Sequence, residues 1–524
     1  MTDARQAPAR QGRAAAWTLL AAALLFLAWI GQLNLLDHDL FHEMALAREV
    51  WARGALPLQD LFAYTPTLSP LVHHEWGAGM VFYAAACALG APGLMALKLL
   101  LSAAIAVLIA RCARRRLRGW ACFCVLTPAA VAMGFIGFAT VRAQIFTLAC
   151  TALLSLLLEL EREGARWWLA AWLVACAVWV NLHAGFVVGG ALLAAHWAEG
   201  ALHGRGAQPR LLLAGLAMAA LVFATPYGAD YPRYLAHALL MPRPAIPEWQ
   251  PLWRSVMRLW LLPPFLLSLA VLAYALAASG WRRLPGLLAT LLCACAALRH
   301  TRHLSLYAVV WLCHAPGWLE DTPLGAWLER LWREKERLVG WAAVALSAAC
   351  LASLIQDRAW RVYIPCNAED AGPGSMIVYP VGAAQYLEDA GFRGNVMTPF
   401  RAGAYVSWRL YPAVKVSLDG RYELAYRPGI FEEVNGFYDG APGWRETLAR
   451  YPTDLVLTRA WYPVVKLLET QTAWRRVYQD GVFELFARPG LMLPGKDRRG
   501  ERLACAFPGP CRPRPCASPR ERGL

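Results

Sequence analysis

Apolar runs long enough to cross a membrane recur along most of this chain, and they limit it to folds that bury those runs in lipid. A helix needs roughly 20 apolar residues to span a hydrocarbon core about 30 Å thick. Such runs lie near residues 14–36, 93–110, 119–139, 143–160, 167–182, 185–202, 211–225, 258–279, 285–298, 303–319 and 338–356. The pattern predicts a membrane all-α core with about eleven transmembrane helices.

Composition excludes the main soluble classes. Hydrophobic residues make up 58% of the 524 residues and charged residues 17%, against about 45–50% and about 25% in soluble domains. A soluble enzyme, a disordered chain and a disulfide-rich secreted domain are therefore excluded. Much of the net charge of +15 lies in short loops between the apolar runs and in the C-terminal tail. This is the charge pattern of membrane topology, so we expect no nucleic-acid partner.

The basic loops predict an orientation, because short cytoplasmic loops are rich in Lys and Arg. Five basic loops fall on the same side as the polar residues 1–13 if the apolar run 76–90 does not cross the membrane. They lie at residues 111–118, 162–166, 205–210, 282–283 and 330–337. We therefore interpret 76–90 as an interfacial or re-entrant helix. The N-terminal tail is predicted to be cytoplasmic and the region after residue 356 extracytoplasmic.

The sequence divides into a transmembrane core at 14–356, which includes a first outer loop at 37–92, and a C-terminal region of different character. Residues 357–490 alternate strand-like and helix-like runs, which predicts a small extracytoplasmic α/β domain. Residues 491–524 are rich in Pro and Arg and are predicted to be disordered. Cys505, Cys511 and Cys516 lie in this tail, where they can oxidise outside the cytoplasm.

With this topology the unusual polar residues share the outer side, and ionisable groups at membrane depth usually mark a site. The alternative is that any loop at a membrane surface is polar. The first outer loop supplies Asp37, Asp39, His42, Glu43, His73, His74 and Glu75, and the outer ends of later runs supply Lys98, Arg142, Asn181, His183, Arg299 and Arg302.

Asp39, His42 and Glu43 are spaced i, i+3, i+4, so a helix would place them on one face. A carboxylate beside His can act as a general base or bind a divalent cation. Asp39 could instead cap that helix. A metal site at His42, His73, His74 and Glu75 is the minority interpretation, because adjacent His residues point in different directions on a helix. No cofactor is assigned, and a divalent cation stays an option.

In the first outer loop an Asp follows the first span, and the predicted helix ends in Ala47, Arg48 and Glu49. This pattern resembles the first loop of GT-C membrane glycosyltransferases, which include lipid A aminoarabinose transferases and protein O-mannosyltransferases. The resemblance implies many spans, a catalytic Asp in the first loop, a soluble C-terminal domain and a polyprenyl-phosphate-linked sugar donor. It places Asp39 at the catalytic position, with Asp37 as its competitor. Leu40 stands where the aminoarabinose branch has Glu, so acceptor and metal details do not transfer.

We therefore expect an inverting glycosyltransferase of the bacterial inner membrane, moving a sugar to an extracytoplasmic lipid, glycan or protein. Arg142, Arg299 and Arg302 are candidates for the donor phosphate because the guanidinium fork bonds two oxygens, and Lys98 is a compact cation nearer the lipid. Interfacial anchoring is the alternative for each. The turn at 419–421 is expected to end a strand, with a sugar or acceptor contact as the minority interpretation. A flippase or transporter for lipid-linked substrates and a non-catalytic assembly subunit are the rival functions.

Overall fold

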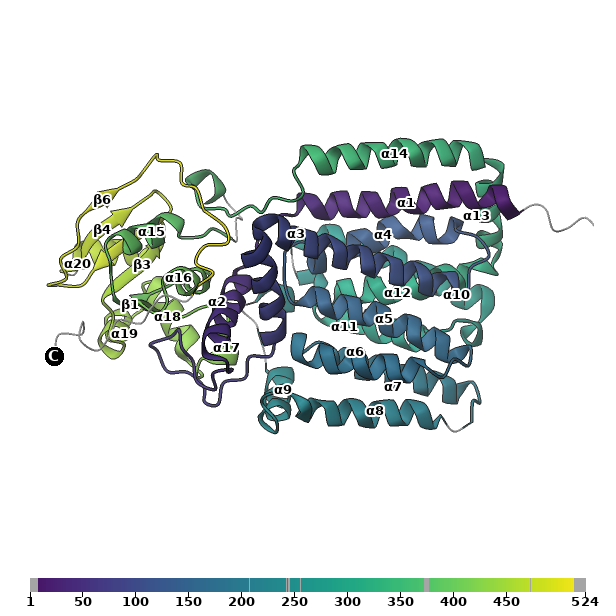
Figure 1. Cartoon of the computed structure of the whole chain (residues 1–524), viewed down its shortest axis with the longest axis horizontal. Helices are drawn as coiled ribbons and strands as arrows, with labels where there is room; N and C mark the ends of the chain where they lie inside the picture. Colours follow the sequence, from purple (N-terminus) through teal and green to yellow (C-terminus); the bar gives the residue numbers. More distant parts are fainter. Residues whose placement is uncertain are drawn as a thin grey trace, which may run out of the picture. The chain divides into compact units, whose positions relative to one another are not determined.

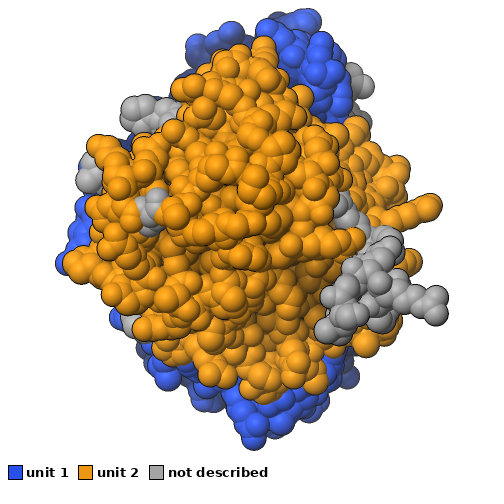
Figure 2. Space-filling model, turned by 90° about the vertical axis from the view of Figure 1, so that its left-hand side faces the viewer, with its two compact units in different colours: residues 1–34, 95–361 blue, residues 35–94, 362–524 orange. Residues whose placement is uncertain are grey.

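The computed structural model describes residues 8–512 apart from positions 207, 242, 244, 245, 255, 372–376 and 472 (Figure 1). The chain divides into two compact units. Unit 1 comprises residues 1–34 and 95–361, and unit 2 comprises residues 35–94 and 362–524 (Figure 2). Unit 2 is therefore assembled from two segments that lie far apart in the sequence.

Unit 1 is helical, and Figure 1 shows its long helices side by side. Helix α1 packs along α14, and α4 packs along α12. The α-helices are α1 (Pro8–Gln32), the second half of α3 (Trp76–Arg114), α4 (Ala121–Phe138), α5 (Gln144–Arg162), α6 (Trp168–Leu182), α7 (Phe186–Leu202), α8 (Pro209–Leu221), α9 (Asp230–Leu240), α10 (Leu262–Ser279), α11 (Leu287–Arg299), α12 (Leu304–Glu320), α13 (Pro323–Glu334) and α14 (Glu336–Gln356). Short 3-10 turns η1–η6 lie at Val222–Ala224, Pro247–Trp249, Leu252–Arg254, Val256–Leu261, Trp281–Arg283 and Thr301–His303.

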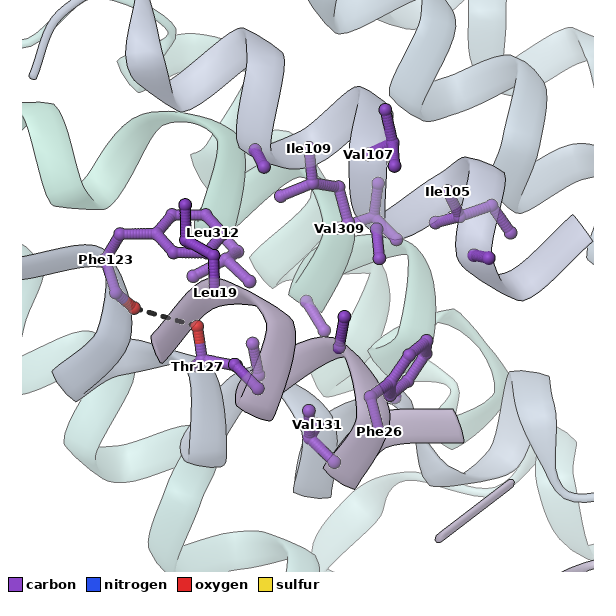
Figure 3. Close-up of a pocket in the computed structure, with 18 of the residues that line it drawn as sticks. Leu19, Phe26, Ile105, Val107, Ile109, Phe123, Thr127, Val131, Val309 and Leu312 are labelled. Carbon is purple, nitrogen blue, oxygen red and sulfur yellow. Dashed lines mark hydrogen bonds between the residues drawn. The ribbon is translucent and has the colours of Figure 1, made fainter. Parts of the chain in front are cut away.

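Every apolar run predicted to span the membrane forms a helix in unit 1, and the chain is a multi-pass membrane protein. Among the described residues, six helices are long and apolar enough to cross a membrane, and four shorter apolar helices accompany them. Helix α12 is buried along nearly its whole length, so it forms the centre of the bundle. An apolar cavity lies among α1, α3, α4 and α12 (Figure 3).

Helix α3 changes direction at Gly90, whose φ of 64° and ψ of −152° are not helical. Glycine adopts this conformation without the penalty that a β-carbon adds. Residues up to 94 belong to unit 2 and the rest of α3 to unit 1. The run 76–90 is thus a helix distinct from the next span, as the sequence also predicts. Whether it lies in the membrane surface stays a prediction.

Unit 2 contains a mixed six-stranded sheet with the order β2-β1-β3-β5-β4-β6. Strand β1 pairs in parallel with β2 and β3, whereas β5 pairs antiparallel with β3 and β4. The strands are β1 (Gly394–Met397), β2 (Val414–Val416), β3 (Leu455–Arg459), β4 (Arg475–Gln479), β5 (Phe483–Ala487) and β6 (Lys496–Asp497). The helices are α2 (His38–Arg53), the first half of α3, η7 (Ala368–Ala371), α15 (Val381–Asp389), α16 (Gly403–Leu410), α17 (Tyr422–Ala425), α18 (Ile430–Tyr438), α19 (Trp444–Arg450) and α20 (Pro463–Gln471). The predicted C-terminal α/β region is confirmed.

The first loop extends this sheet. Tyr64 N–H donates to the Val416 carbonyl at 3.0 Å, and Val416 N–H donates to the Phe62 carbonyl at 2.9 Å. Helix α2 also packs against α16. Residues 37–92 were grouped with the transmembrane core on sequence, but in the structure they fold with the α/β region.

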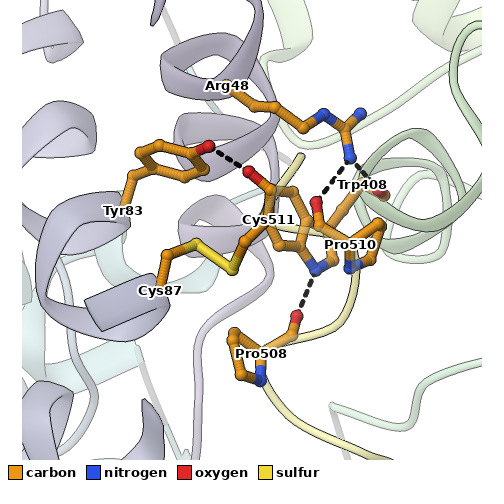
Figure 4. Close-up of a disulfide and its surroundings, with 7 residues drawn as sticks. All are labelled: Arg48, Tyr83, Cys87, Trp408, Pro508, Pro510 and Cys511. Atoms are coloured by element: carbon orange, nitrogen blue, oxygen red, sulfur yellow. Dashed lines mark hydrogen bonds between the residues drawn. A yellow bond between two sulfur atoms is a disulfide. The ribbon is translucent and has the colours of Figure 1, made fainter. Parts of the chain in front are cut away.

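The C-terminal tail is ordered as far as Arg512, so the prediction of disorder from residue 491 is wrong for residues 491–512. A disulfide joins Cys511 to Cys87 in the first half of α3 (Figure 4). Trp408 Nε1 donates to the Pro508 carbonyl at 2.6 Å, and Arg48 Nη1 donates to the Pro510 carbonyl at 3.1 Å. A covalent bond and these hydrogen bonds fix a segment whose composition alone favours disorder. Residues 513–524, with Cys516, lie outside the described residues.

Candidate functional site

Three polar residues begin helix α2, and the structure separates their roles. Asp37 is the N-cap: its backbone is extended and its carboxylate accepts the Asp39 N–H at 3.1 Å. Capping by a short acidic side chain satisfies a backbone donor that the first helical turn leaves open. Asp39 is therefore not the cap of this helix. Its side chain is 20% exposed, so a substrate can reach it.

His38 lies between the two carboxylates. Its Nδ1 is 3.4 Å from Asp37 Oδ1, and its Nε2 is 3.4 Å from Asp39 Oδ1. A neutral imidazole has one N–H, so it can serve only one of these oxygens as a donor. One potential ligand atom from each of the three residues lies within 4.8 Å of the others. Carboxylate and imidazole groups of this kind suit a divalent transition-metal ion.

The turn after β2 lies against these residues. A β-carbon added at Gly420 would lie 2.8 Å from His38 Cδ2 and 2.9 Å from Asp39 Oδ1. Only a glycine fits this approach without movement of the carboxylate. Residues 419–421 do follow a strand in a turn, as predicted, and that turn contacts the candidate catalytic residue.

Arg421 fixes the turn to the first loop. Its Nε and Nη2 bond both oxygens of Asp419 at 2.6–3.1 Å, and its Nη1 bonds Asp60. All three side chains are buried. Burial by itself would raise the pKa of Asp419, but the Arg421 guanidinium more than offsets this and the pKa is lowered. The pKa of Arg421 is correspondingly raised well above its usual range by Asp419 and Asp60, against the effect of burial. The ion pair therefore stays charged, and two carboxylates share one guanidinium.

Buried histidines and carboxyls surround this ion pair. Burial lowers the pKa of His42 and, together with the charge of Arg421, lowers the pKa of His73 well below its usual range. Burial and the neighbouring Glu75 carboxylate raise the pKa of Glu43 well above its usual range. His74 Nε2 lies 3.3 Å from Glu75 Oε1. The lowered pKa values of His42 and His73 favour neutral imidazoles there, and the raised pKa of Glu43 favours its protonated form, so these groups can hold or pass a proton near Asp39.

A solved structure shares this fold. The crystal structure of ArnT from Cupriavidus metallidurans in the apo state aligns with a TM-score of 0.52 and 12% identity, covering 90% of this chain and 98% of that one. The chain has the ArnT fold. No family model matches the sequence, and no curated protein matches it. Because ArnT is a GT-C glycosyltransferase, the predicted resemblance to that group is confirmed at the level of the fold.

Within this ArnT-like fold, the structure also brings together two of the predicted phosphate-binding arginines in unit 1. Arg142 Nη1 bonds Glu248 Oε1 at 3.0 Å, and the Arg302 guanidinium lies 4.6 Å from the centre of the Trp249 ring. Glu248 and Trp249 are neighbours in η2, so the two arginines flank one short segment. Arg299 is exposed at the end of α11, and within the described part of the chain it forms no hydrogen bond or ion pair with this segment.

Other predicted residues hold helix ends. Lys98 is buried, and its ammonium donates to the carbonyls of Ile30, Leu33 and Ala139, at the C-terminal ends of α1 and α4. Cations stabilise such ends. His183 Nδ1 accepts the Gly185 N–H at 2.7 Å, which shapes the connection between α6 and α7. The Asn181 side chain bonds the carbonyl one helical turn before it.

Sequence reasoning missed two groups. Asp60 gave no local signal, because its partner Arg421 is 361 positions away. The second is a buried ion network at the ends of the unit 1 helices that carry the basic loops. Glu159, Arg162, His196 and Glu199 belong to it, and Glu199 also accepts the Gly286 and Leu288 N–H groups. The network caps α11, so it has a structural role.

Proposed function

We propose that this protein is an integral membrane glycosyltransferase that moves a sugar from a polyprenyl-phosphate donor to an extracytoplasmic lipid, glycan or protein. The observation that carries the proposal is Asp39, an accessible carboxylate at the start of α2 whose capping role is taken by Asp37. The ArnT-like fold also supports the proposal, because it suggests a lipid-linked sugar transferase.

The proposed mechanism is a single displacement with inversion. Asp39 accepts the proton of the acceptor hydroxyl or amine as that atom attacks the anomeric carbon. The new glycosidic bond forms as the bond from the anomeric carbon to the phosphate oxygen breaks, and the polyprenyl phosphate leaves with the electron pair. Arg142 and Arg302, with Arg299 as a further candidate, would bind the phosphate and stabilise its developing charge. Lys98 does not join them, because its ammonium already donates to three backbone carbonyls.

A divalent cation would be held by Asp37, His38 and Asp39, the group whose ligand atoms lie within 4.8 Å of one another. When bound there, it would neutralise negative charge on a phosphate oxygen. Gly420 would pack against Asp39 and His38 and limit their movement, and the ion pair of Arg421 with Asp419 would hold the turn that contains Gly420 in place.

We further propose about eleven spans, a cytoplasmic N-terminus and an extracytoplasmic unit 2 in a bacterial inner membrane. The five basic loops support this orientation. The disulfide between Cys87 and Cys511 supports it independently, because disulfides persist in oxidising compartments and are rare in the cytosol.

The test compares Asp39→Asn with Asp37→Asn in membranes, at equal protein levels. Asn keeps the size of Asp and can still cap a helix, so both variants should fold. Loss of the general base should lower the rate of sugar transfer by about 10²–10⁴-fold in Asp39→Asn, and the effect of Asp37→Asn should be much smaller. Full transfer by Asp39→Asn would refute the catalytic assignment and favour a flippase or an assembly subunit.

A further inference from the structure

An apolar cavity in unit 1 has no part in the proposed chemistry. It has a volume of about 480 Å³ and lies among α1, α3, α4 and α12. Figure 3 shows Leu19, Phe26, Ile109, Val309 and Leu312 around the same space. The hydroxyl of Thr127 is occupied by a 2.8 Å hydrogen bond to the Phe123 carbonyl. Ser305 is a second hydroxyl in the lining, and it donates to the Arg302 carbonyl at 3.5 Å. Away from these two hydroxyls and from the arginines, the cavity offers a ligand mainly apolar contacts.

The cavity opens to the surface of the bundle. Leu20 and Val107 line it and are 44% and 51% exposed. These side chains belong to helices long and apolar enough to cross a membrane. Since the surface around them faces lipid in a membrane protein, an apolar chain can enter from the bilayer.

One end of the cavity is cationic. Five arginines lie between residues 111 and 118, and three of them have carboxylate partners. Arg115 pairs with Glu163 at 3.1 Å, Arg116 with Glu159 at 2.8 Å and Arg118 with Asp321 at 2.7 Å.

The other two, Arg111 and Arg114, both line the cavity. Arg114 bonds the Leu117 carbonyl and lies over the Trp120 ring at 5.6 Å. Neither has a carboxylate partner within the described part of the chain. The two arginines without an acidic partner are thus the two that border the apolar space.

We propose that this cavity binds one acyl chain of an anionic membrane phospholipid, whose phosphate is held by Arg111 and Arg114. The apolar lining fits the acyl chain, and the two guanidinium groups, which have no carboxylate partner among the described residues, fit the phosphate. Trp120 lies at the same end and suits the boundary between headgroup and acyl chain, where Trp is enriched.

This site is separate from the proposed donor phosphate site. Trp120 directly precedes α4 and Arg142 follows it. An 18-residue helix is about 27 Å long, so one phosphate cannot contact both ends. The inference therefore does not rest on the proposed glycosyltransferase activity.

The experiment titrates delipidated full-length protein in detergent with phosphatidylglycerol or with phosphatidylcholine of the same acyl chains, and native mass spectrometry counts the bound lipids. Each arginine near a lipid surface contributes on the order of 1 kcal/mol, which is about five-fold in affinity. We expect one copy of phosphatidylglycerol to bind at least tenfold more tightly than phosphatidylcholine. Arg111→Gln should weaken that copy about five-fold, and Arg118→Gln, which removes the same charge from a paired arginine, should not.

Substitutions that fill the cavity test whether the acyl chain of the lipid lies there. Ala106→Phe fills the cavity from α3 and should abolish tight binding of this copy, whereas Ala104→Phe on the same helix, at an exposed position outside the lining, should leave it unchanged. Ala110→Leu serves if Ala106→Phe does not fold. Equal affinity for the two lipids, equal effects of Arg111→Gln and Arg118→Gln, or unchanged binding in the filled cavity would each overturn the proposal. Displacement of this copy by a polyprenyl phosphate would overturn it as well, because the donor chain would then be the occupant.

Discussion

Gly420 approaches Asp39 so closely that a β-carbon at position 420 would lie 2.9 Å from the Asp39 Oδ1. The two residues are 381 positions apart, since one begins α2 and the other follows β2. The loop that holds Asp39 and the C-terminal α/β region therefore form a single structural unit.

Gly420→Ala should lower the rate of sugar transfer while leaving the fold intact. The added methyl group must displace Asp39, His38 or the turn, and a misplacement of about 1 Å can cost about 10²-fold in rate. Steady-state transfer in membranes measures the effect, with thermal stability of the purified protein as the check on folding. Gly495→Ala is the matched control, because nothing lies within 4 Å of a β-carbon there. Equal activity of the two variants would contradict a role for this contact.

Glu43 gives a prediction for the dependence of stability on pH. Its pKa in the folded protein is raised well above the ordinary 4.5 by burial and by Glu75. Below about pH 4.5 the folded and unfolded states both keep the proton. As pH rises above that value the unfolded state loses its proton first, so the contribution to stability falls until the folded pKa is passed.

Glu43→Gln removes this titration. Between pH 5 and pH 8 the variant should gain stability relative to the wild type, by up to about 1.4 kcal/mol per pH unit until the folded pKa is reached. Thermal unfolding followed by intrinsic fluorescence across this range measures the difference. Glu432→Gln makes the same substitution at an exposed position on α18 and is the control. Parallel curves for wild type and Glu43→Gln would show that Glu43 is ionised in the folded protein.

Arg302→Lys tests the proposed phosphate contact. Lysine keeps the positive charge but loses the planar fork and the stacking on Trp249. We expect the KM for the lipid-linked donor to rise about tenfold, the loss of roughly one charge-assisted hydrogen bond, with a smaller change in kcat. Arg233→Lys on α9, where Arg233 is 80% exposed and pairs with Asp230, is the control. Unchanged donor KM would assign Arg302 to packing on Trp249.

Sequence alone predicted the elements better than their assembly. Apolar runs such as 119–139 and 143–160 became α4 and α5, because hydropathy over 20 residues is a local property. The spacing of Asp39, His42 and Glu43 likewise predicted the α2 helix. The contacts of the first loop with β2 and the pairing of Asp60 with Arg421 were not foreseen, since hydrogen bonds over 361 positions leave no local pattern. The ordered tail escaped prediction for the same reason, as its partner Cys87 lies 424 positions away.

The disulfide provides the last prediction. Alkylation of intact cells before lysis, followed by digestion without reductant, should yield the Cys87 and Cys511 peptides joined together. Cys87→Ser should release the tail and speed its proteolysis after Arg498 or Arg499. Removal of a native disulfide typically costs about 2–5 kcal/mol, so a measurable loss of thermal stability should follow. Cys295→Ser, at an exposed unpaired cysteine on α11, is the control.

The same bond tests the orientation. An oxidised pair is expected only if unit 2 lies outside the cytoplasm, and the basic loop at 282–283 must then lie inside. Reporter fusions placed after Arg283 and after Arg512 should therefore report opposite sides of the membrane. If both fusions report the same side, the span count is wrong. If Cys87 and Cys511 are recovered as free, fully alkylated thiols, the extracytoplasmic assignment of unit 2 loses its covalent support, and hydrogen bonds such as those of Arg48 and Trp408 must hold the tail without the disulfide.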